Sequence, residues 1–227
     1  MDIVISAYFT AFILGAIHAI ELDHLVAVSV FAGLRPKLKA AASYGARWGL
    51  GHAAIVVLVG SILAALNIRL DAYWQYWGEA LVGAALIGLA VWAIAVSVSN
   101  RGVVSRNESL VYACHSQPDG LDHGLTQSQR HRHIPTAMGA LHGLAGSAPL
   151  LALIPITLLN DFKQALIYLV LFSVGTTLAM VIYAVTAACA VQGLGAHKLG
   201  ERWLSFLIAA ITFGVGVFWL VQAWANL

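Results

Sequence analysis

Charged residues are scarce in this chain. Only 10% of the 227 residues are charged and 60% are hydrophobic, with a mean hydropathy of +0.84. A soluble globular protein carries roughly 25% charged residues. This composition therefore excludes an ordinary soluble protein and indicates an integral membrane protein with no extramembrane domain.

Cysteine and net charge are also low. Cys114 and Cys189 are the only cysteines and form no CxxC motif, which argues against a disulfide framework and against a thiol-redox carrier. A formal net charge of +2 implies no polyanion-binding surface, so nucleic acid is not expected as a partner. The first residues, MDI, lack the positive n-region of a signal peptide, and we expect the first apolar run to stay in the mature protein.

Long apolar runs fill most of the chain. A helical crossing needs about 20 apolar residues, and lipid offers no hydrogen-bond partners to the backbone, so each span must be a helix. The apolar runs therefore predict an all-α integral membrane protein with about six transmembrane helices. The predicted spans are residues 4–33, 40–66, 75–99, 135–158, 162–191 and 203–225. The expected units are a three-helix repeat over 1–99, a cytoplasmic loop over 100–134 and a second three-helix repeat over 135–227.

Most basic residues lie in alternate connections between the spans. One side has Arg35, Lys37, Lys39, Arg101, Arg106, Arg130, Arg132, Lys198 and Arg202, and the other has Arg69 and Lys163. By the positive-inside rule, this predicts a multi-pass protein of a bacterial-type inner (plasma) membrane with both termini outside the cytoplasm. Aromatic residues at the start of the third span indicate an interfacial anchor. Glu79, which follows them, is expected to be solvated at headgroup depth, and a functional role is the alternative.

The stretch GAIHAIELDHLVAV, residues 15–28, places four ionisable side chains in an apolar run. An ionised carboxylate in a bilayer costs at least about 2.5 kcal/mol, so the stretch indicates an intramembrane functional site. At about 100° per residue, His18, Glu21 and His24 share one face of a continuous helix. Asp23 lies off that face and could meet the same ligand only if the helix unwinds locally or if it serves a neighbouring helix.

A related stretch, GALHGLAGSAPLLAL, opens the fourth span and pairs His142 with His18 at an offset of 142 − 18 = 124 residues. The same offset pairs Gly51 with Gly175, His52 with Thr176, and Asp23 with Ser147. Repeats of three spans must run in opposite directions, so the predicted fold is a pair of inverted three-helix repeats, as in many secondary transporters. Chance similarity between glycine-rich apolar segments is the alternative.

His52 and His142 extend the candidate site. Each alone would be interpreted as a buried histidine bonded to a carbonyl group, but their alignment with the motif and its repeat favours function. Arg47 is explained by snorkelling at the cytoplasmic end of the second span or by pairing with the aspartate of the motif. Together with Ser147 and Thr176, Arg47 is a candidate gating or site-lining residue.

The polar segment 100–134 holds further histidines: His115, His123, His131 and His133. Neutral imidazole suits nickel, cobalt, copper and zinc, so these residues form a candidate accessory metal loop. Their spacing is irregular, and a polar loop with incidental histidines is an equal alternative.

The candidate metal residues offer nitrogen and oxygen but no sulfur. They are His18, Glu21, Asp23, His24, His52 and His142. This set suits Ni²⁺, Co²⁺, Zn²⁺, Mn²⁺ or Fe²⁺ better than Cu⁺, and proton competition for the same groups makes an exchange of metal for protons chemically available. Transport of such an ion is the predicted function. An intramembrane metalloenzyme that retains its metal is the alternative, although the chain has no HExxH motif.

Three segments resemble the nickel/cobalt transporter superfamily. HAIELDH, residues 18–24, resembles its His-x4-Asp-His signature, and RWGLGH, residues 47–52, resembles its second-helix motif ending in Gly-His. LHGLAGSAP, residues 141–149, is similar to the short urease-accessory-type membrane proteins of that superfamily. The chain departs from the family at Glu21, where aspartate is frequent, and in having six predicted spans where larger members have eight.

The resemblance implies a permease and not an enzyme. It implies that His18, Asp23, His24 and His52 are metal ligands or selectivity residues, and that Ni²⁺ or Co²⁺ is the transported substrate. No permanent cofactor is expected, and the expected partners are the metal ion and the lipid bilayer.

Overall fold

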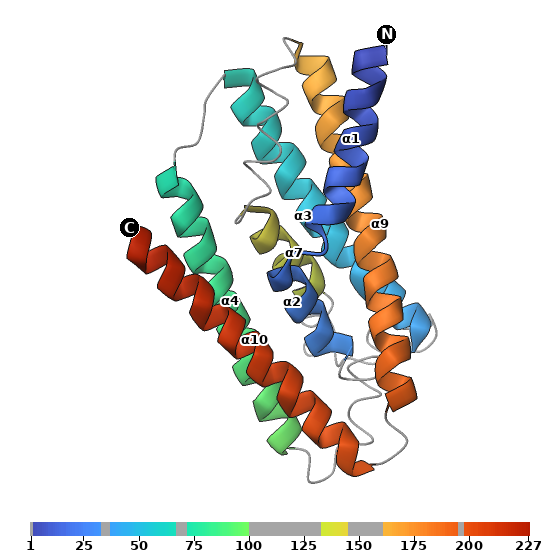
Figure 1. The fold of residues 1–227 in the computed structure, drawn as a ribbon, viewed down its shortest axis with the longest axis vertical. Coiled ribbons are helices and arrows are strands. Elements are labelled where there is room, and N and C mark those ends of the chain that lie inside the picture. The colour runs from blue at the N-terminus through green and yellow to red at the C-terminus, as the bar shows by residue number, and fades with distance from the viewer. Residues whose placement is uncertain (1, 33–36, 67–71, 100–132, 145–160, 195–197) are drawn as a thin grey trace, which may run out of the picture.

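The computed structural model describes residues 2–32, 37–66, 72–99, 133–144, 161–194 and 198–227. Within these ranges every regular element is an α-helix (Figure 1). The helices are α1 (Asp2–His18), α2 (Leu22–Ala32), α3 (Leu38–Leu66), α4 (Ala72–Ser99), α7 (Ile134–Leu144), α9 (Phe162–Leu194) and α10 (Lys198–Asn226). The all-α prediction is therefore confirmed.

Four of these helices are long and apolar enough to cross a membrane: Leu38–Leu66, Tyr73–Ala95, Phe162–Gln192 and Trp203–Asn226. A fifth candidate is the pair α1 and α2, which is bent by 56° at a short break. The described residues thus give four spans, or five with the bent pair, where the sequence predicted six. α7 covers the start of the predicted span 135–158, and the rest of that span lies outside the described residues.

The span predicted over residues 4–33 is not one continuous helix, because α1 ends at His18 and α2 begins at Leu22. In an unbroken helix the carbonyl oxygen of His18 would accept the N–H of Leu22. It accepts instead the N–H of Glu21 at 3.0 Å and Nδ1–H of His24 at 3.2 Å. Asp23 lies in the first turn of α2, where a negative charge suits the helix dipole. The His24 ring and the Glu21 backbone amide therefore satisfy the carbonyl oxygen that loses its helical partner at the break.

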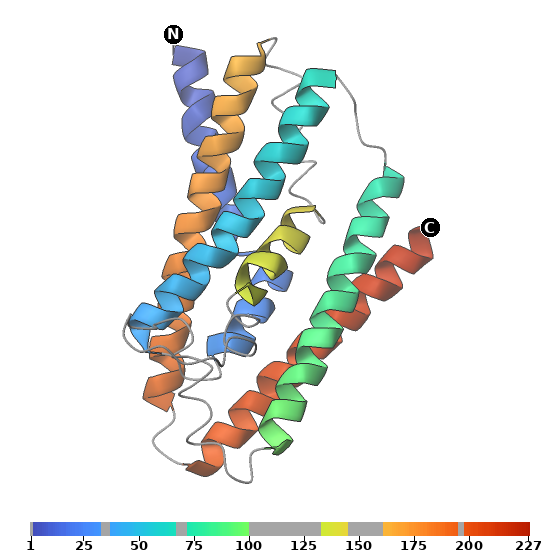
Figure 2. The same ribbon diagram turned by 180° about the vertical axis from the view of Figure 1, so that it is seen from behind.

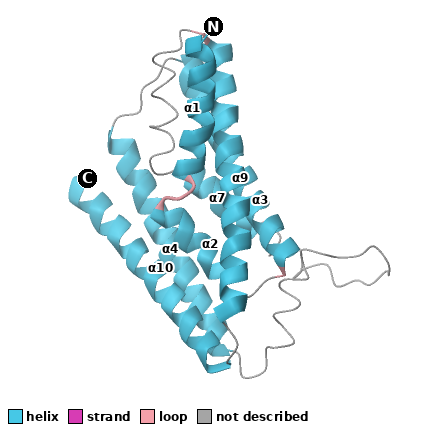
Figure 3. Cartoon of the chain, turned by 45° about the vertical axis from the view of Figure 1, so that its right-hand side comes forward, coloured by secondary structure: helices cyan, strands magenta, loops and turns pink. Residues whose placement is uncertain are grey.

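Two helix groups flank this break. α1, α3 and α9 pack together (Figure 2), with Ala11 and Phe172 in their shared core. On the other flank α4 crosses α10, and Val82 and Val215 of these helices pack against Val26 of α2. α2 and α7 lie between the two groups (Figure 3). The break is thus held inside the helix bundle.

Close helix packing surrounds the end of α1. A Cβ atom added at Gly15 would overlap the backbone carbonyl of Phe172 on α9, so only glycine permits this approach. One turn further along α9, the hydroxyl group of Thr176 donates to the carbonyl oxygens of Gly15 at 2.9 Å and Phe172 at 3.0 Å. The position of His18 therefore depends on the contact between α1 and α9.

Replacing Thr176 with valine is expected to lower the free energy of unfolding by about 0.5–1.5 kcal/mol, because an interhelical hydrogen bond in a membrane contributes on this scale. Valine keeps the shape of the side chain and removes only the donor. Thermal unfolding in detergent measures the change. Thr186→Val is the matched control, since that exposed hydroxyl bonds only within its own helix, to Tyr183. Equal stability of the two variants would contradict the expectation.

The outer surface of the bundle is apolar, as expected of a surface that faces lipid. Phe9 is 68% exposed and Ile182 63% exposed. Trp74 and Trp77 at the start of α4 are also exposed, in agreement with an interfacial anchor. The prediction that Glu79 is solvated is wrong: this residue is only 6% exposed and accepts a hydrogen bond from Gln75 Nε2 at 2.7 Å.

Candidate metal centre

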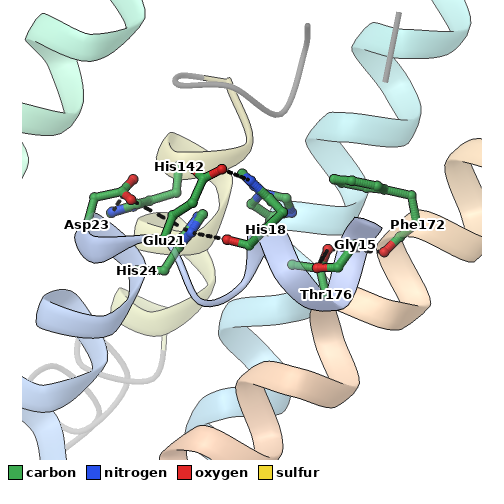
Figure 4. Close-up of polar contacts among 9 residues, drawn as sticks. Gly15, His18, Glu21, Asp23, His24, His142, Phe172 and Thr176 are labelled. Carbon is green, nitrogen blue, oxygen red and sulfur yellow. Dashed lines mark hydrogen bonds and ion pairs between the residues drawn. The ribbon is translucent and has the colours of Figure 1, made fainter. Parts of the chain in front are cut away.

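Four buried imidazoles meet at the break, each from a different helix. His18 ends α1, His24 lies in the first turns of α2, His52 lies on α3 and His142 on α7. The ring of His24 lies 4.7 Å from that of His18, 5.6 Å from that of His52 and 5.2 Å from that of His142, measured between centroids. Figure 4 shows the histidines of α1, α2 and α7 side by side. Residues far apart in the sequence thus form one cluster.

The Nδ1 atoms of three of these rings are held by oxygen atoms. His24 Nδ1 donates to the His18 carbonyl at 3.2 Å, and His142 Nδ1 donates to the Met138 carbonyl at 2.9 Å. His18 Nδ1 lies 2.9 Å from Glu21 Oε1. A carbonyl oxygen only accepts, so the bonded nitrogen carries the hydrogen and Nε2 keeps its lone pair. Metal-binding histidines in proteins are oriented in this way.

Ring nitrogens of His18, His24 and His52 come close together. His18 Nε2 and His52 Nε2 lie 3.3 Å apart, and one ligand atom from each of His18, His24 and His52 lies within 4.8 Å of the others. Two nitrogens bound to one ion at about 2.1 Å are themselves separated by about 3.0–3.4 Å. His24 Nε2 is buried and has no hydrogen-bond partner among the described residues. These three histidines can hold a first-row metal ion.

Carboxylates lie beside the imidazoles. Asp23 is 5% exposed, with Oδ1 3.8 Å from His24 Nδ1 and Oδ2 4.0 Å from His142 Nε2. Glu21, Asp23 and His24 form a second set of ligand atoms within 4.8 Å of one another. The helix unwinds between residues 18 and 22, and this brings Asp23 to the cluster. In a continuous helix Asp23 would face away from the cluster. Local unwinding was one of the two ways in which the sequence allowed Asp23 to meet the same ligand as the histidines.

Trp48 is part of the centre and was not singled out in the sequence. Its buried ring stacks on His52, with centroids 5.4 Å apart and planes inclined by 14°, and the ring of His24 meets it edge-on at 4.8 Å. Residues four apart share a helix face, so its spacing from His52 was the available signal. The indole walls off one side of the imidazoles and limits how their rings can turn.

The remaining predicted residues lie elsewhere. The hydroxyl of Thr176 is engaged with two carbonyl oxygens, in helix packing beside the centre. Arg47 is partly buried on α3. His133 is exposed immediately before α7. Outside the described residues lie Ser147, His115, His123 and His131.

Comparisons with known proteins agree with this chemistry. The chain is 28% identical over 170 residues to the urease accessory protein UreH of Bacillus sp. (strain TB-90), covering 74% of this chain and 70% of the relative. It is 27% identical over 219 residues to the chloroplast protein FOR GROWTH AND FERTILITY 1 of Arabidopsis thaliana, covering 94% of this chain and 59% of the relative. No solved structure matches the chain. Residues 4–226 match the NicO family, described as high-affinity nickel-transport protein, and the chain belongs to that family.

Proposed function

We propose that this protein carries a divalent transition-metal ion, Ni²⁺ first and Co²⁺ second, across a membrane through the centre at the break. The observation that carries the proposal is the convergence of His18, His24 and His52, three buried imidazoles from three helices, on one point. The transporter family to which the chain belongs favours a permease over a metalloenzyme. The metal ion is the substrate and not a resident cofactor.

The donor set suits passage as well as binding. Imidazole nitrogens replace part of the water shell of a borderline ion, and Asp23 offsets its charge in a low-dielectric region. Glu21 is partly exposed, with 35% of its side chain accessible, so it connects the buried nitrogens to water. Broken helices are typical of transporter binding sites, because two half-helices can shift about the ion.

Glycine contacts support the inverted repeat. A Cβ at Gly15 would overlap the carbonyl of Phe172, and a Cβ at Gly139 would overlap that of Trp48. The two glycines are 139 − 15 = 124 residues apart, and the two carbonyl residues are 172 − 48 = 124 residues apart. The offset found in the sequence therefore relates one contact to the other. A second pair is related in the same way: Gly175 with Phe12, and Gly51 with Thr136. The contact of α1 with α9 thus corresponds to that of α7 with α3, as a two-fold relation requires.

The arrangement of helix ends supports a topology with both termini outside the cytoplasm of a plasma membrane. α3 begins with Lys37 and Lys39 beside it, and α10 begins at Lys198; both starts lie at the same end of the bundle (Figure 1). α9 begins at the opposite end, near the N-terminus, with Lys163 in its first turn. The positive-inside rule assigns the end richer in lysine to the cytoplasm.

The other candidate residues are assigned to accessory roles. Thr176 packs beside the centre on α9, Arg47 directly precedes Trp48 on α3, and Ser147 follows α7 in sequence, which suits gating or lining of the path. The loop histidines, of which His133 is exposed at the start of α7, would collect metal on the cytoplasmic side.

Flux measured with the whole protein tests the function. Proteoliposomes loaded with a metal-sensitive dye are expected to take up Ni²⁺ and Co²⁺ faster than Mn²⁺, because a nitrogen-rich site favours the later ions of the first row. Protein-free liposomes provide the baseline. Uptake at that baseline for every ion, with a monodisperse protein, would defeat the proposal. Slow, stoichiometric retention of metal together with turnover of a substrate would favour the metalloenzyme.

A further inference from the structure

A cavity of about 250 Å³ lies next to the metal centre, between the break and the flank formed by α4 and α10. The residues that line it come from three places: Glu21, Leu22 and Asp23 at the break, Gln75, Glu79 and Val82 on α4, and Trp219 on α10. Glu21 also contacts His18, so it belongs both to the cavity and to the imidazole cluster. The cavity therefore borders the imidazole cluster.

The polar lining of this cavity is acidic. Three of its side chains are carboxylates, and none of the described residues that line it is basic. Asp23 is 5% exposed and its Oδ1 atom has no hydrogen-bond partner within the described part of the chain. Burying a carboxylate oxygen without a partner is costly, and a bound cation would remove that cost. The orphaned oxygen is the observation that points to a ligand.

Glu79 is the member of this group that the metal centre does not explain. It is 6% exposed and lies on α4, a helix that contributes no histidine to the cluster. Gln75 Nε2 donates to its Oε1 at 2.7 Å, which fixes the direction of the carboxylate. Lipid-facing helix positions need no such group, and the cost of an intramembrane carboxylate requires a reason.

We propose that the cavity is a second cation site, which holds a hydrated divalent metal ion between Glu79 and Asp23 before the ion reaches the imidazoles. At about 30 Å³ per water molecule, 250 Å³ accommodates an ion with its six-water shell. Carboxylate and amide oxygens bind such ions with their water retained. The cavity thus attracts cations by charge, and the nitrogen cluster then selects among them.

The position of the cavity indicates from which side of the membrane an ion would enter the path. Gln75 and Glu79 lie in the first turns of α4, toward the end of the bundle where both termini lie (Figure 1). In the proposed topology this is the non-cytoplasmic side. This inference rests on the proposed function, because it assigns the cavity to the same ion path.

Binding of Mn²⁺, followed by electron paramagnetic resonance, tests the cavity separately from transport. The background is the full chain in detergent with His18, His24 and His52 replaced by alanine, which removes the nitrogen site. One Mn²⁺ is expected to bind. Glu79→Gln is expected to weaken its affinity at least about tenfold, because removing one unit charge close to a divalent ion has this effect even at the dielectric constant of water. Glu79→Asp, which keeps the charge, is expected to stay within about threefold of the background.

Asp161→Asn is the matched control. It removes one carboxylate charge from an exposed position just before α9, and asparagine keeps an acceptor for the Lys163 N–H that Asp161 now binds. Its Mn²⁺ affinity is expected to equal that of the background. If Glu79→Gln fails to elute as a monodisperse protein, Gln75→Ala, which releases the Glu79 carboxylate, is expected to weaken binding in the same direction.

The outcomes separate this inference from the proposed function. Absence of Mn²⁺ binding in the background, or equal affinity with and without the Glu79 carboxylate, overturns the second site even if the wild type transports Ni²⁺. Mn²⁺ binding that depends on Glu79 in a protein without Ni²⁺ flux retains the cation site and defeats the transport proposal.

Discussion

Nickel uptake at low substrate concentration is expected to fall by at least about 100-fold in each of the variants His18→Ala, His24→Ala and His52→Ala. Changes to residues that merely orient a metal ligand cost 10–100-fold in affinity, so loss of a ligand belongs at or above the upper limit. His24→Ala should have the largest effect, because His24 also donates to the His18 carbonyl across the break. Initial rates of Ni²⁺ entry into proteoliposomes measure all three.

His133→Ala is the matched control for these variants. It removes an imidazole from an exposed position immediately before α7, outside the cluster. At saturating Ni²⁺, where collection of metal by the loop no longer limits uptake, its rate should equal that of the wild type, whereas the cluster variants should stay slower. Folding is monitored by elution profile and helical circular dichroism. Wild-type uptake in any two of the cluster variants, with the fold intact, would remove the imidazoles from the transport path.

Alanine at Gly139 or at Gly15 is expected to prevent correct folding, with a loss of at least about 3 kcal/mol. Overpacking usually costs 1–3 kcal/mol when side chains can adjust. Here the added Cβ would overlap a backbone carbonyl, that of Trp48 opposite Gly139 and that of Phe172 opposite Gly15. A carbonyl oxygen of a helix cannot rotate away, so the helices must separate.

Two other glycines provide the comparison. A Cβ at Gly88 on α4 or Gly214 on α10 would meet no atom within 4 Å, and alanine has the higher helix propensity. Gly88→Ala and Gly214→Ala should therefore unfold at or slightly above the wild-type temperature in detergent. If Gly139→Ala and Gly15→Ala behaved like these two, the close helix contacts would not exist in solution.

The histidines and carboxylates of the candidate centre could be picked out from the sequence because charge is so costly in a bilayer, whereas Trp48 could not. His18, Asp23 and His24 stand out in an apolar run, and the offset of 124 residues brought His142 to notice. The NicO family match confirms the resemblance found in these motifs. Their roles as ligands stay a prediction that the flux variants test.

The break in the first span and the burial of Glu79 could not be predicted, because they depend on tertiary contacts that the pattern of apolar residues does not contain. At the break after His18, the His24 side chain and the Glu21 amide share one carbonyl oxygen, and a helical wheel cannot represent such a bond. The burial of Glu79 depends on where α4 meets the break. A carboxylate beside interfacial aromatics has the same sequence pattern whether it faces water or a cavity.

The hydrogen bond from His24 Nδ1 to the His18 carbonyl links occupancy of the site to the shape of the span. If the proposed metal ion binds at Nε2, it would withdraw electron density from the ring, which would make Nδ1–H a stronger donor and favour the bent geometry in which that bond is made. By reciprocity, any movement that straightens the two half-helices must weaken the grip on the ion by the same free energy. In the proposed transport, release of the ion and a change in the angle between α1 and α2 would therefore be thermodynamically coupled.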